Sequence, residues 1–225
     1  MDTSNKSGRN LAVVSLISLA LTAMFNLALA DGATIALHGN DRGAPACSIC
    51  HGAHGEGIPA NGFPRIAGLN AGYLQIQLDA FASGQRVNAM MTPVAQTLSG
   101  EERAKVTHYY AGLSGSATLK EPVSEMNSTG ARLAMQGRWS QGLPACAQCH
   151  GVMGSGVGTA FPALAGQSSL YIENQLHAWQ QGTRAPGQLG LMKVVASKLS
   201  AADIQEVAAY FSALPASDLF RRSKP

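Results

Sequence analysis

Ala-Pro-Ala-Cys-Ser-Ile-Cys-His-Gly at residues 44–52 is matched by Leu-Pro-Ala-Cys-Ala-Gln-Cys-His-Gly at residues 143–151. These two stretches contain every cysteine of the 225-residue chain, and in both a histidine directly follows a Cys-x-x-Cys pair. The residues concerned are Cys47, Cys50, His51, Cys146, Cys149 and His150. A motif that recurs after 99 residues indicates an internal duplication.

The similarity continues downstream of both stretches. Phe-Pro-Arg-Ile-Ala-Gly at residues 63–68 corresponds to Phe-Pro-Ala-Leu-Ala-Gly at residues 161–166. Further matched pairs, 98 or 101 residues apart, are Tyr73/Tyr171, Gln77/Gln175, Gly84/Gly182, Arg86/Arg184, Met91/Met192, Leu98/Leu199 and Tyr109/Tyr210. Because only short insertions shift the offset, we predict two tandem domains of the same fold.

The boundary between the two domains is predicted in a segment rich in Ser, Thr and Glu. Residues 114–128 include Pro122 and lack apolar periodicity, so we assign them as a linker. The first domain then spans residues 31–113 and the second residues 129–225. Units of roughly 80–100 residues bury a small core, and each would gain from a large cofactor held in its interior.

Local signals predict an all-α fold with long loops. Ser99 with Glu102 forms a capping box that opens a helix, and Ser200 with Asp203 opens the matching one. Apolar residues then recur on one face of each helix: Val106, Tyr109, Tyr110 and Leu113 in the first, and Ile204, Val207, Ala208, Phe211 and Leu214 in the second. Another helix is expected to begin near Tyr73 and near Tyr171, and no segment shows strand-like alternation.

Residues 1–30 have the features of an export signal. They combine a positively charged start, an apolar run over residues 11–25 and a small-residue Ala-Leu-Ala triplet at residues 28–30. We therefore predict cleavage before Asp31 and a mature protein in the periplasm. The alternative is an uncleaved membrane anchor, because residues 11–29 approach the length of about 20 residues that a membrane span needs.

Composition narrows the range of partners. A net charge of +3, scattered along the chain, argues against nucleic-acid binding. The 25 glycines, 10 prolines and a charged fraction of 13 % predict a compact protein rich in turns, not a long-helix scaffold.

The Cys-x-x-Cys-His units indicate two covalently bound haem c groups. Two thiols form thioether bonds to the porphyrin and the histidine binds the iron, and a helical turn brings Cys47 and His51 to the same face. A redox dithiol expects a thioredoxin-like βαβ setting, and a zinc site expects the two pairs roughly 15–20 residues apart. Structural disulfides in an exported protein are a third alternative, but they leave the paired histidines unexplained.

The second axial ligand is predicted to be a methionine in each half. Met91 precedes Ser99 by eight residues and Met192 precedes Ser200 by eight, so the two occupy the same register. A methionine opposite the histidine raises the reduction potential and closes the iron to substrates. The rival candidates are Met90, Met153 and His54, and ordinary core packing is the other common fate of a methionine. His38, His108 and His177 have no repeated partner and receive no role.

With these residues in place, the chain resembles the cytochrome c4 family, whose members join two class I cytochrome c domains. The resemblance covers about residues 33–215 and rests on the set Cys-x-x-Cys-His-Gly, Phe-Pro-x-(Ile/Leu)-Ala-Gly, Tyr-x-x-x-Gln-Leu and Met before Leu-Ser. It implies that the carbonyls of Pro64 and Pro162 accept hydrogen bonds from the rings of His51 and His150. It also implies two domains facing each other across a pseudo-twofold axis with haem edges close together.

The predicted function is electron transfer without substrate turnover. The expected donors are a quinol-oxidising complex or a periplasmic dehydrogenase, and the expected acceptors are a terminal oxidase or a small periplasmic carrier. One alternative is a fixed dihaem subunit of a flavocytochrome of the sulfide dehydrogenase type. The other is a dihaem peroxidase, which needs one iron without a methionine ligand.

Overall fold

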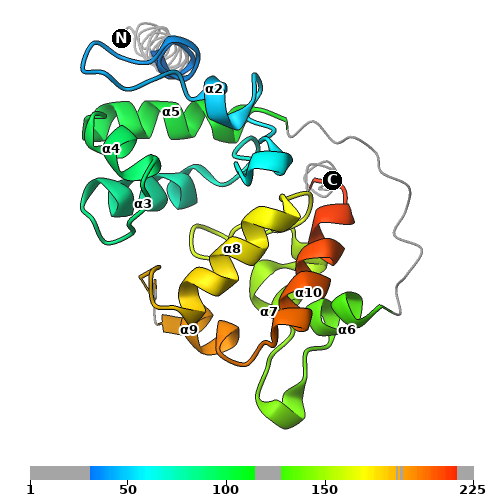
Figure 1. Cartoon of the computed structure of the whole chain (residues 1–225). Helices are drawn as coiled ribbons and strands as arrows, with labels where there is room; N and C mark the ends of the chain where they lie inside the picture. Colours follow the sequence, from blue (N-terminus) through cyan, green and yellow to red (C-terminus); the bar gives the residue numbers. More distant parts are fainter. Residues whose placement is uncertain (1–30, 115–127, 186, 188–189, 217–225) are drawn as a thin grey trace, which may run out of the picture.

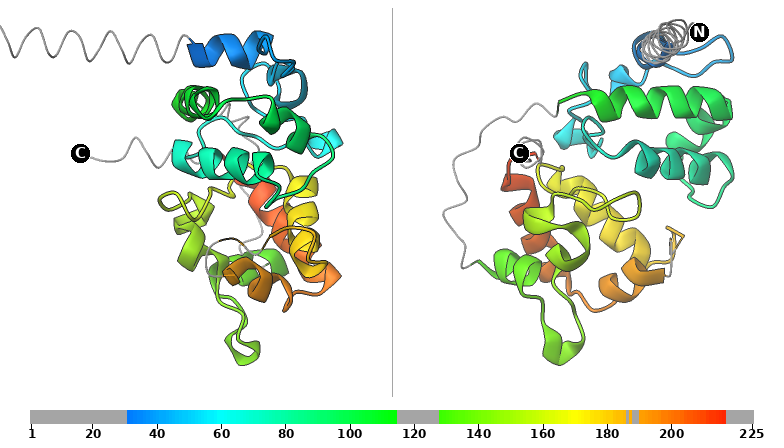
Figure 2. Two further views of the ribbon diagram at one scale, coloured as in Figure 1. Left: turned by 90° about the vertical axis from the view of Figure 1, so that its left-hand side faces the viewer. Right: turned by 180° about the vertical axis from the view of Figure 1, so that it is seen from behind.

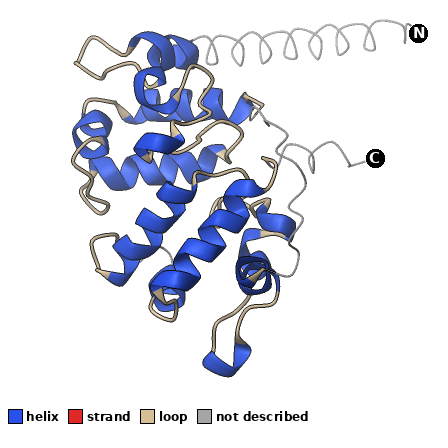
Figure 3. Cartoon of the chain, turned by 45° about the vertical axis from the view of Figure 1, so that its right-hand side comes forward, coloured by secondary structure: helices blue, strands red, loops and turns tan. Residues whose placement is uncertain are grey.

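The computed structural model describes residues 31–114, 128–185, 187 and 190–216 (Figure 1). The predicted signal segment 1–30 lies outside the described residues, as does most of the predicted linker 114–128. Within the described part of the chain the regular elements are helices, and β-pairing is limited to isolated bridges (Figure 3). The prediction of an all-α fold is therefore confirmed.

The two halves contain corresponding helices. In the first half, residues 31–38 are helical and are followed by α2 (Ser48–His51), η1 (Pro59–Asn61), α3 (Ala71–Ala82), α4 (Met91–Gln96) and α5 (Gly100–Gly112). The second half contains α6 (Thr129–Met135), η2 (Trp139–Gln141), α7 (Cys146–His150), η3 (Val152–Gly154), α8 (Ser169–Gln180), α9 (Leu191–Ala196) and α10 (Ala201–Ala213). Figure 2 shows the two halves as bodies stacked one on the other. In the first half α3 packs against α5, and in the second α8 packs against α10.

The predicted helix starts are confirmed by their caps. The Ser99 hydroxyl accepts from the Glu102 N–H and the Glu102 carboxylate accepts from the Ser99 N–H. Ser200 and Asp203 make the same reciprocal pair at α10. These bonds satisfy backbone donors that a helix N-terminus otherwise leaves without partners.

A glycine lies at the crossing of the first and last helices in each half. A Cβ on Gly32 would lie 2.4 Å from the Lys105 carbonyl oxygen of α5, and a Cβ on Gly130 would lie 2.1 Å from the Glu206 carbonyl oxygen of α10. Only a residue without a side chain allows backbones to approach this closely. The first helix of each half therefore packs directly against the backbone of the last one, α5 or α10.

Each half has its own hydrophobic core. The second-half core includes Phe211, Leu143 and Ile204, which are fully buried, with Cys146 and Met192 packed at its edge. In the first half the core includes Leu69, Leu98 and Tyr110, with Cys47 at its edge. In both halves, therefore, the first cysteine of the repeated motif packs against the hydrophobic core.

The halves also contact each other directly. Arg86 and Arg184 form an antiparallel β-bridge across the junction, and α8 packs against η1. A search of the described helices finds none with both the length and the apolarity of a membrane span.

Candidate functional site

The two Cys-x-x-Cys-His motifs form single helical turns, α2 and α7, as the motif spacing predicts. In α2 the His51 N–H donates to the Cys47 carbonyl over 2.9 Å, which places both residues on one face of the turn. Each turn ends at a glycine with positive φ, Gly52 at +83° and Gly151 at +79°. A Cβ on Gly52 would lie 2.5 Å from the Glu56 carboxyl group, so this tight exit favours glycine on both counts.

Both motif histidines are buried and held by a proline carbonyl. The Nδ1 of His51 lies 3.0 Å from the Pro64 oxygen, and the Nδ1 of His150 lies 2.8 Å from the Pro162 oxygen. This pairing, implied by the family resemblance, is confirmed. Burial lowers the pKa of both imidazoles, although the proline carbonyls act in the opposite direction. A neutral ring that donates from Nδ1 presents Nε2 as a free ligand atom.

The four cysteines are free thiols that are not paired in disulfides. Burial raises the pKa of the Cys47 and Cys146 thiols to about 11. A redox dithiol works through a thiolate of lowered pKa, which neither Cys47 nor Cys146 shows. No cluster of three or more His, Cys, Asp or Glu side chains suited to a metal ion occurs in the described ranges.

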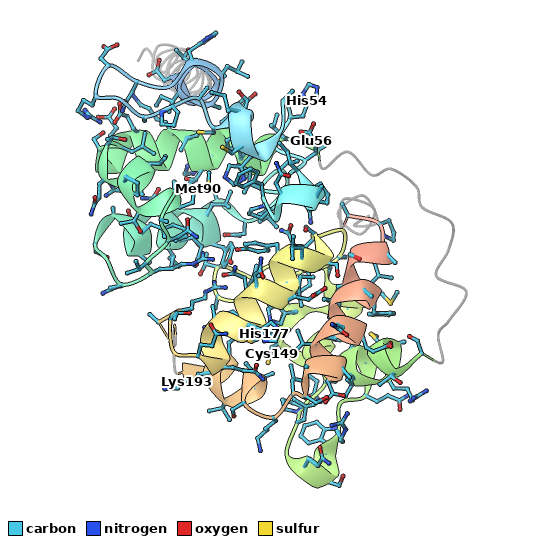
Figure 4. The ribbon with its side chains drawn as sticks, in the orientation of Figure 1. His54, Glu56, Met90, Cys149, His177 and Lys193 are labelled. Atoms are coloured by element: carbon cyan, nitrogen blue, oxygen red, sulfur yellow. The ribbon has the colours of Figure 1, made fainter. Side chains whose placement is uncertain are left out.

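The methionines at matched register lie at the first turns of matched helices. Met91 begins α4 and Met192 lies in the first turn of α9, and both are partly buried. Met192 packs against the same core as Cys146. Met90 occupies the N-cap position of α4 without a capping side-chain bond, and it is 51 % exposed (Figure 4). Met153 accepts a weak hydrogen bond from the Tyr210 hydroxyl over 3.8 Å.

The other histidines lie away from the two motif turns or on the surface. His38, His54 and His108 are exposed, and the backbone N–H of His54 is bonded to the Glu56 carboxylate (Figure 4). His177 is partly buried and pairs with Gln180.

Arginine, glutamine and tyrosine side chains from both halves form a polar cluster at the junction. The sequence analysis found these residues to be repeated but gave them no role. The Arg86 guanidinium donates to Gln77 over 2.7 Å, to Gln175 over 2.6 Å and to the Tyr171 hydroxyl over 3.2 Å. Arg184 donates to the same two glutamines over 3.2 and 2.9 Å. Identical residues at a constant offset were the available signal, but only the fold shows that both copies meet at one place.

This cluster carries two buried positive charges. The described oxygen partners of both guanidinium groups are neutral, and burial together with Arg86 lowers the pKa of Arg184. Buried like charges are costly without a nearby anion.

The residues therefore fit one haem c in each half. Each half supplies two adjacent free thiols, a buried imidazole with its Nδ1 occupied and a partly buried thioether. The hydroxyl of Tyr110 is buried beside the thiol of Cys47, where α5 packs against the motif turn of the first half.

Comparisons with known proteins agree with this geometry. The family model Cytochrome c matches residues 30–114 and again residues 128–215. The chain is 43 % identical over 204 residues to a thiosulfate dehydrogenase electron acceptor from Stutzerimonas stutzeri (strain A1501), covering 90 % of this chain and 93 % of that protein. It is 35 % identical over 206 residues to cytochrome c4 from Pseudomonas aeruginosa, covering 91 % and 98 % of the two chains.

The fold is also similar to that of a solved structure. The thiosulfate dehydrogenase of Marichromatium purpuratum, in its as-isolated form, superposes with a TM-score of 0.76 at 39 % identity over 83 % of this chain. This chain spans 40 % of that longer protein. The chain thus belongs to the cytochrome c family and, within it, to the dihaem cytochromes of the c4 type, which carry one covalently bound haem c in each half.

Proposed function

We propose that this chain is a periplasmic electron carrier that takes electrons from a thiosulfate-oxidising dehydrogenase. The single observation that carries the proposal is the pair of equivalent sites in which a buried histidine, tied through Nδ1, shares its half with a partly buried methionine at matched register. Two such side chains would hold the iron of a bound haem between them, which would suit electron transfer and leave no ligand position for a substrate.

The proposal assigns each site residue a role. The thiols of Cys47, Cys50, Cys146 and Cys149 would hold the two haems through thioether bonds. The axial ligands would be His51 with Met91 in the first half and His150 with Met192 in the second. When bound, each haem supplies a one-electron iron couple, whose potential a Met ligand raises.

The chain's own residues keep these ligands in place. The carbonyls of Pro64 and Pro162 orient the two imidazoles, and Phe63 and Phe161 lie against the rings with centroids 6.4 and 6.0 Å away. The buried aromatic side chains of Tyr110 in α5 and of Tyr210 and Phe211 in α10 keep water out of the core beside each site. A dry and rigid site lowers the reorganisation that accompanies a change of iron charge.

The proposed electron donor is inferred from the names of similar proteins, not from a feature of this protein's surface. The relative from Stutzerimonas stutzeri is named as an electron acceptor of thiosulfate dehydrogenase, and the fold also occurs within the dehydrogenase of Marichromatium purpuratum. A quinol-oxidising complex is the alternative donor, and a terminal oxidase or small carrier remains the proposed acceptor. A fixed subunit of a flavocytochrome is the second candidate function.

Stopped-flow reduction of the holoprotein distinguishes these donors. The oxidised protein, with its two haems counted by intact mass, is mixed with Stutzerimonas stutzeri thiosulfate dehydrogenase and thiosulfate. We expect rapid reduction of both haems that depends on both reagents. Reduction that proceeds only with sulfide and a flavocytochrome dehydrogenase would support the second candidate, and ready carbon monoxide binding by either reduced haem would refute the closed carrier.

A further inference from the structure

One residue of the second half reaches the histidine site of the first half through a single peptide group. The carbonyl of Pro64 accepts from His51 Nδ1 over 3.0 Å. The N–H of the same peptide group, that of Arg65, donates to the Gln167 side-chain oxygen over 2.9 Å. The hydrogen bonds therefore form a continuous chain from His51 through the Pro64–Arg65 peptide to Gln167.

Further bonds hold this contact in place. The Gln167 amide nitrogen donates to the Arg65 carbonyl over 2.9 Å, so the glutamine pairs with Arg65 on both sides. The Arg65 guanidinium donates to the carbonyls of Ala165 and Gly166 across the junction over 2.9 and 3.3 Å. Gln167 is 3 % exposed and Arg65 is 4 % exposed, so water does not compete for these groups.

The second half lacks the equivalent chain. His150 donates to Pro162 in the same way, but the next peptide N–H belongs to Ala163 and has no hydrogen-bond acceptor among the described residues. The position that corresponds to Gln167 is Leu69, which cannot accept a hydrogen bond. Leu69 and Ala163 instead lie together in one apolar cluster. The junction is thus polar where Arg65 meets Gln167 and apolar where the corresponding residues, Ala163 and Leu69, meet.

A peptide that donates at its N–H becomes a stronger acceptor at its carbonyl, because successive hydrogen bonds polarise one another by about 10–30 % per bond. A stronger acceptor at Nδ1 makes an imidazole a more basic ligand, and a more basic ligand favours the ferric iron. We propose that Gln167 is a positioning residue that lowers the reduction potential of the first haem through Arg65, Pro64 and His51. The second haem is free of this influence, so the junction makes two similar sites unequal.

This inference rests on the proposed role of His51 as an axial ligand and goes beyond it. It predicts which haem responds to a change at the junction and in which direction. If Gln167 only held the two domains together, its replacement would weaken the fold without selectively moving the potential of one haem.

The test is a spectroelectrochemical titration of the full holoprotein carrying Gln167→Leu, which places at this position the residue found at 69. We expect the ferric-to-ferrous ratio of the first haem, at a fixed solution potential, to fall about two- to threefold. This corresponds to an upward shift of about 18–28 mV at 59 mV per decade. The second midpoint stays unchanged, and proton NMR of the haem methyl groups assigns the two. In the reduced protein, the His51 Nδ1 proton moves upfield because its hydrogen bond is weaker.

Ser168→Ala is the matched control. The Ser168 hydroxyl caps α8 and makes no bond in the chain to His51, whereas the Ser168 N–H, which donates to the Gln167 oxygen over 3.0 Å, is kept in alanine. Loss of the hydroxyl should therefore lower the unfolding temperature and leave both potentials in place. Gln167→Asn, whose amide is too short to reach Arg65, replaces the leucine variant if that variant does not fold. An unchanged first midpoint in a variant with two intact low-spin haems, or an equal shift of both, overturns the inference. A wild-type protein without two such haems would instead refute the proposed function.

Discussion

Replacing Gly130 by alanine is expected to destabilise the second domain selectively. The new Cβ would lie 2.1 Å from the Glu206 carbonyl oxygen and 3.1 Å from the Tyr210 Cβ, so α6 and α10 must separate by roughly 1 Å to reach van der Waals contact. Overpacking of this kind costs about 1–3 kcal/mol, and alanine returns up to about 1 kcal/mol through its helix propensity. We expect a net loss of about 1–2 kcal/mol.

Thermal unfolding of the holoprotein, followed by far-ultraviolet circular dichroism, measures this effect. A net loss of that size lowers the melting temperature of a domain of this length by about 5–15 °C. Gly112→Ala is the control, because Gly112 is also helical but a Cβ there meets nothing within 4 Å. It should raise stability by up to about 1 kcal/mol. Equal melting temperatures for Gly130→Ala and wild type would refute the reasoning.

Three further changes test the sites. Met91→Ala should abolish one low-spin His/Met centre, seen as loss of half the near-infrared charge-transfer intensity, whereas Met90→Ala should leave both centres; the reverse result would reassign the ligand. The Arg138 guanidinium, 2.6 Å from Asp203, holds the pKa of that carboxyl at about 2, below its ordinary 3.8. The stabilisation this gives is present above about pH 4 and is lost as pH falls towards 2, so Asp203→Asn should be less stable at pH 6 and show a flatter acid denaturation curve. Arg86→Gln should lower the haem potentials in a redox titration, because removing a buried positive charge favours ferric iron. A rise in the potentials would contradict the view that Arg86 acts as a buried positive charge.

Several features of the fold could be predicted from local sequence because their causes are local. The capping boxes at Ser99 and Ser200 involve residues three positions apart, so the starts of α5 and α10 followed directly from the sequence. The turns α2 and α7 likewise depend on contacts within five residues. The helix at residues 31–38 and the role of Gly32 were not predicted, because a small residue needed at a helix crossing has no local signature.

The Cys-x-x-Cys-His motifs could also be recognised from the sequence, since a covalent attachment site for haem must present its thiols and imidazole on one turn. Internal repetition then identified Met91 and Met192 as matched candidates, a prediction that their positions at the starts of α4 and α9 support but that only spectroscopy tests. Repetition also marked Arg86 and Arg184 without indicating a role.

The sequence by itself determined the helical class, the duplication and the two covalently bound haems, because each depends on residues that are close along the chain or repeated at a constant spacing. Only the tertiary structure decided how the halves differ. Gln167 and Arg65 are 102 residues apart and neither is repeated, so no periodic signal connects them. Their pairing exists because the folded domains bring two backbone segments within hydrogen-bonding distance in a place that water does not reach.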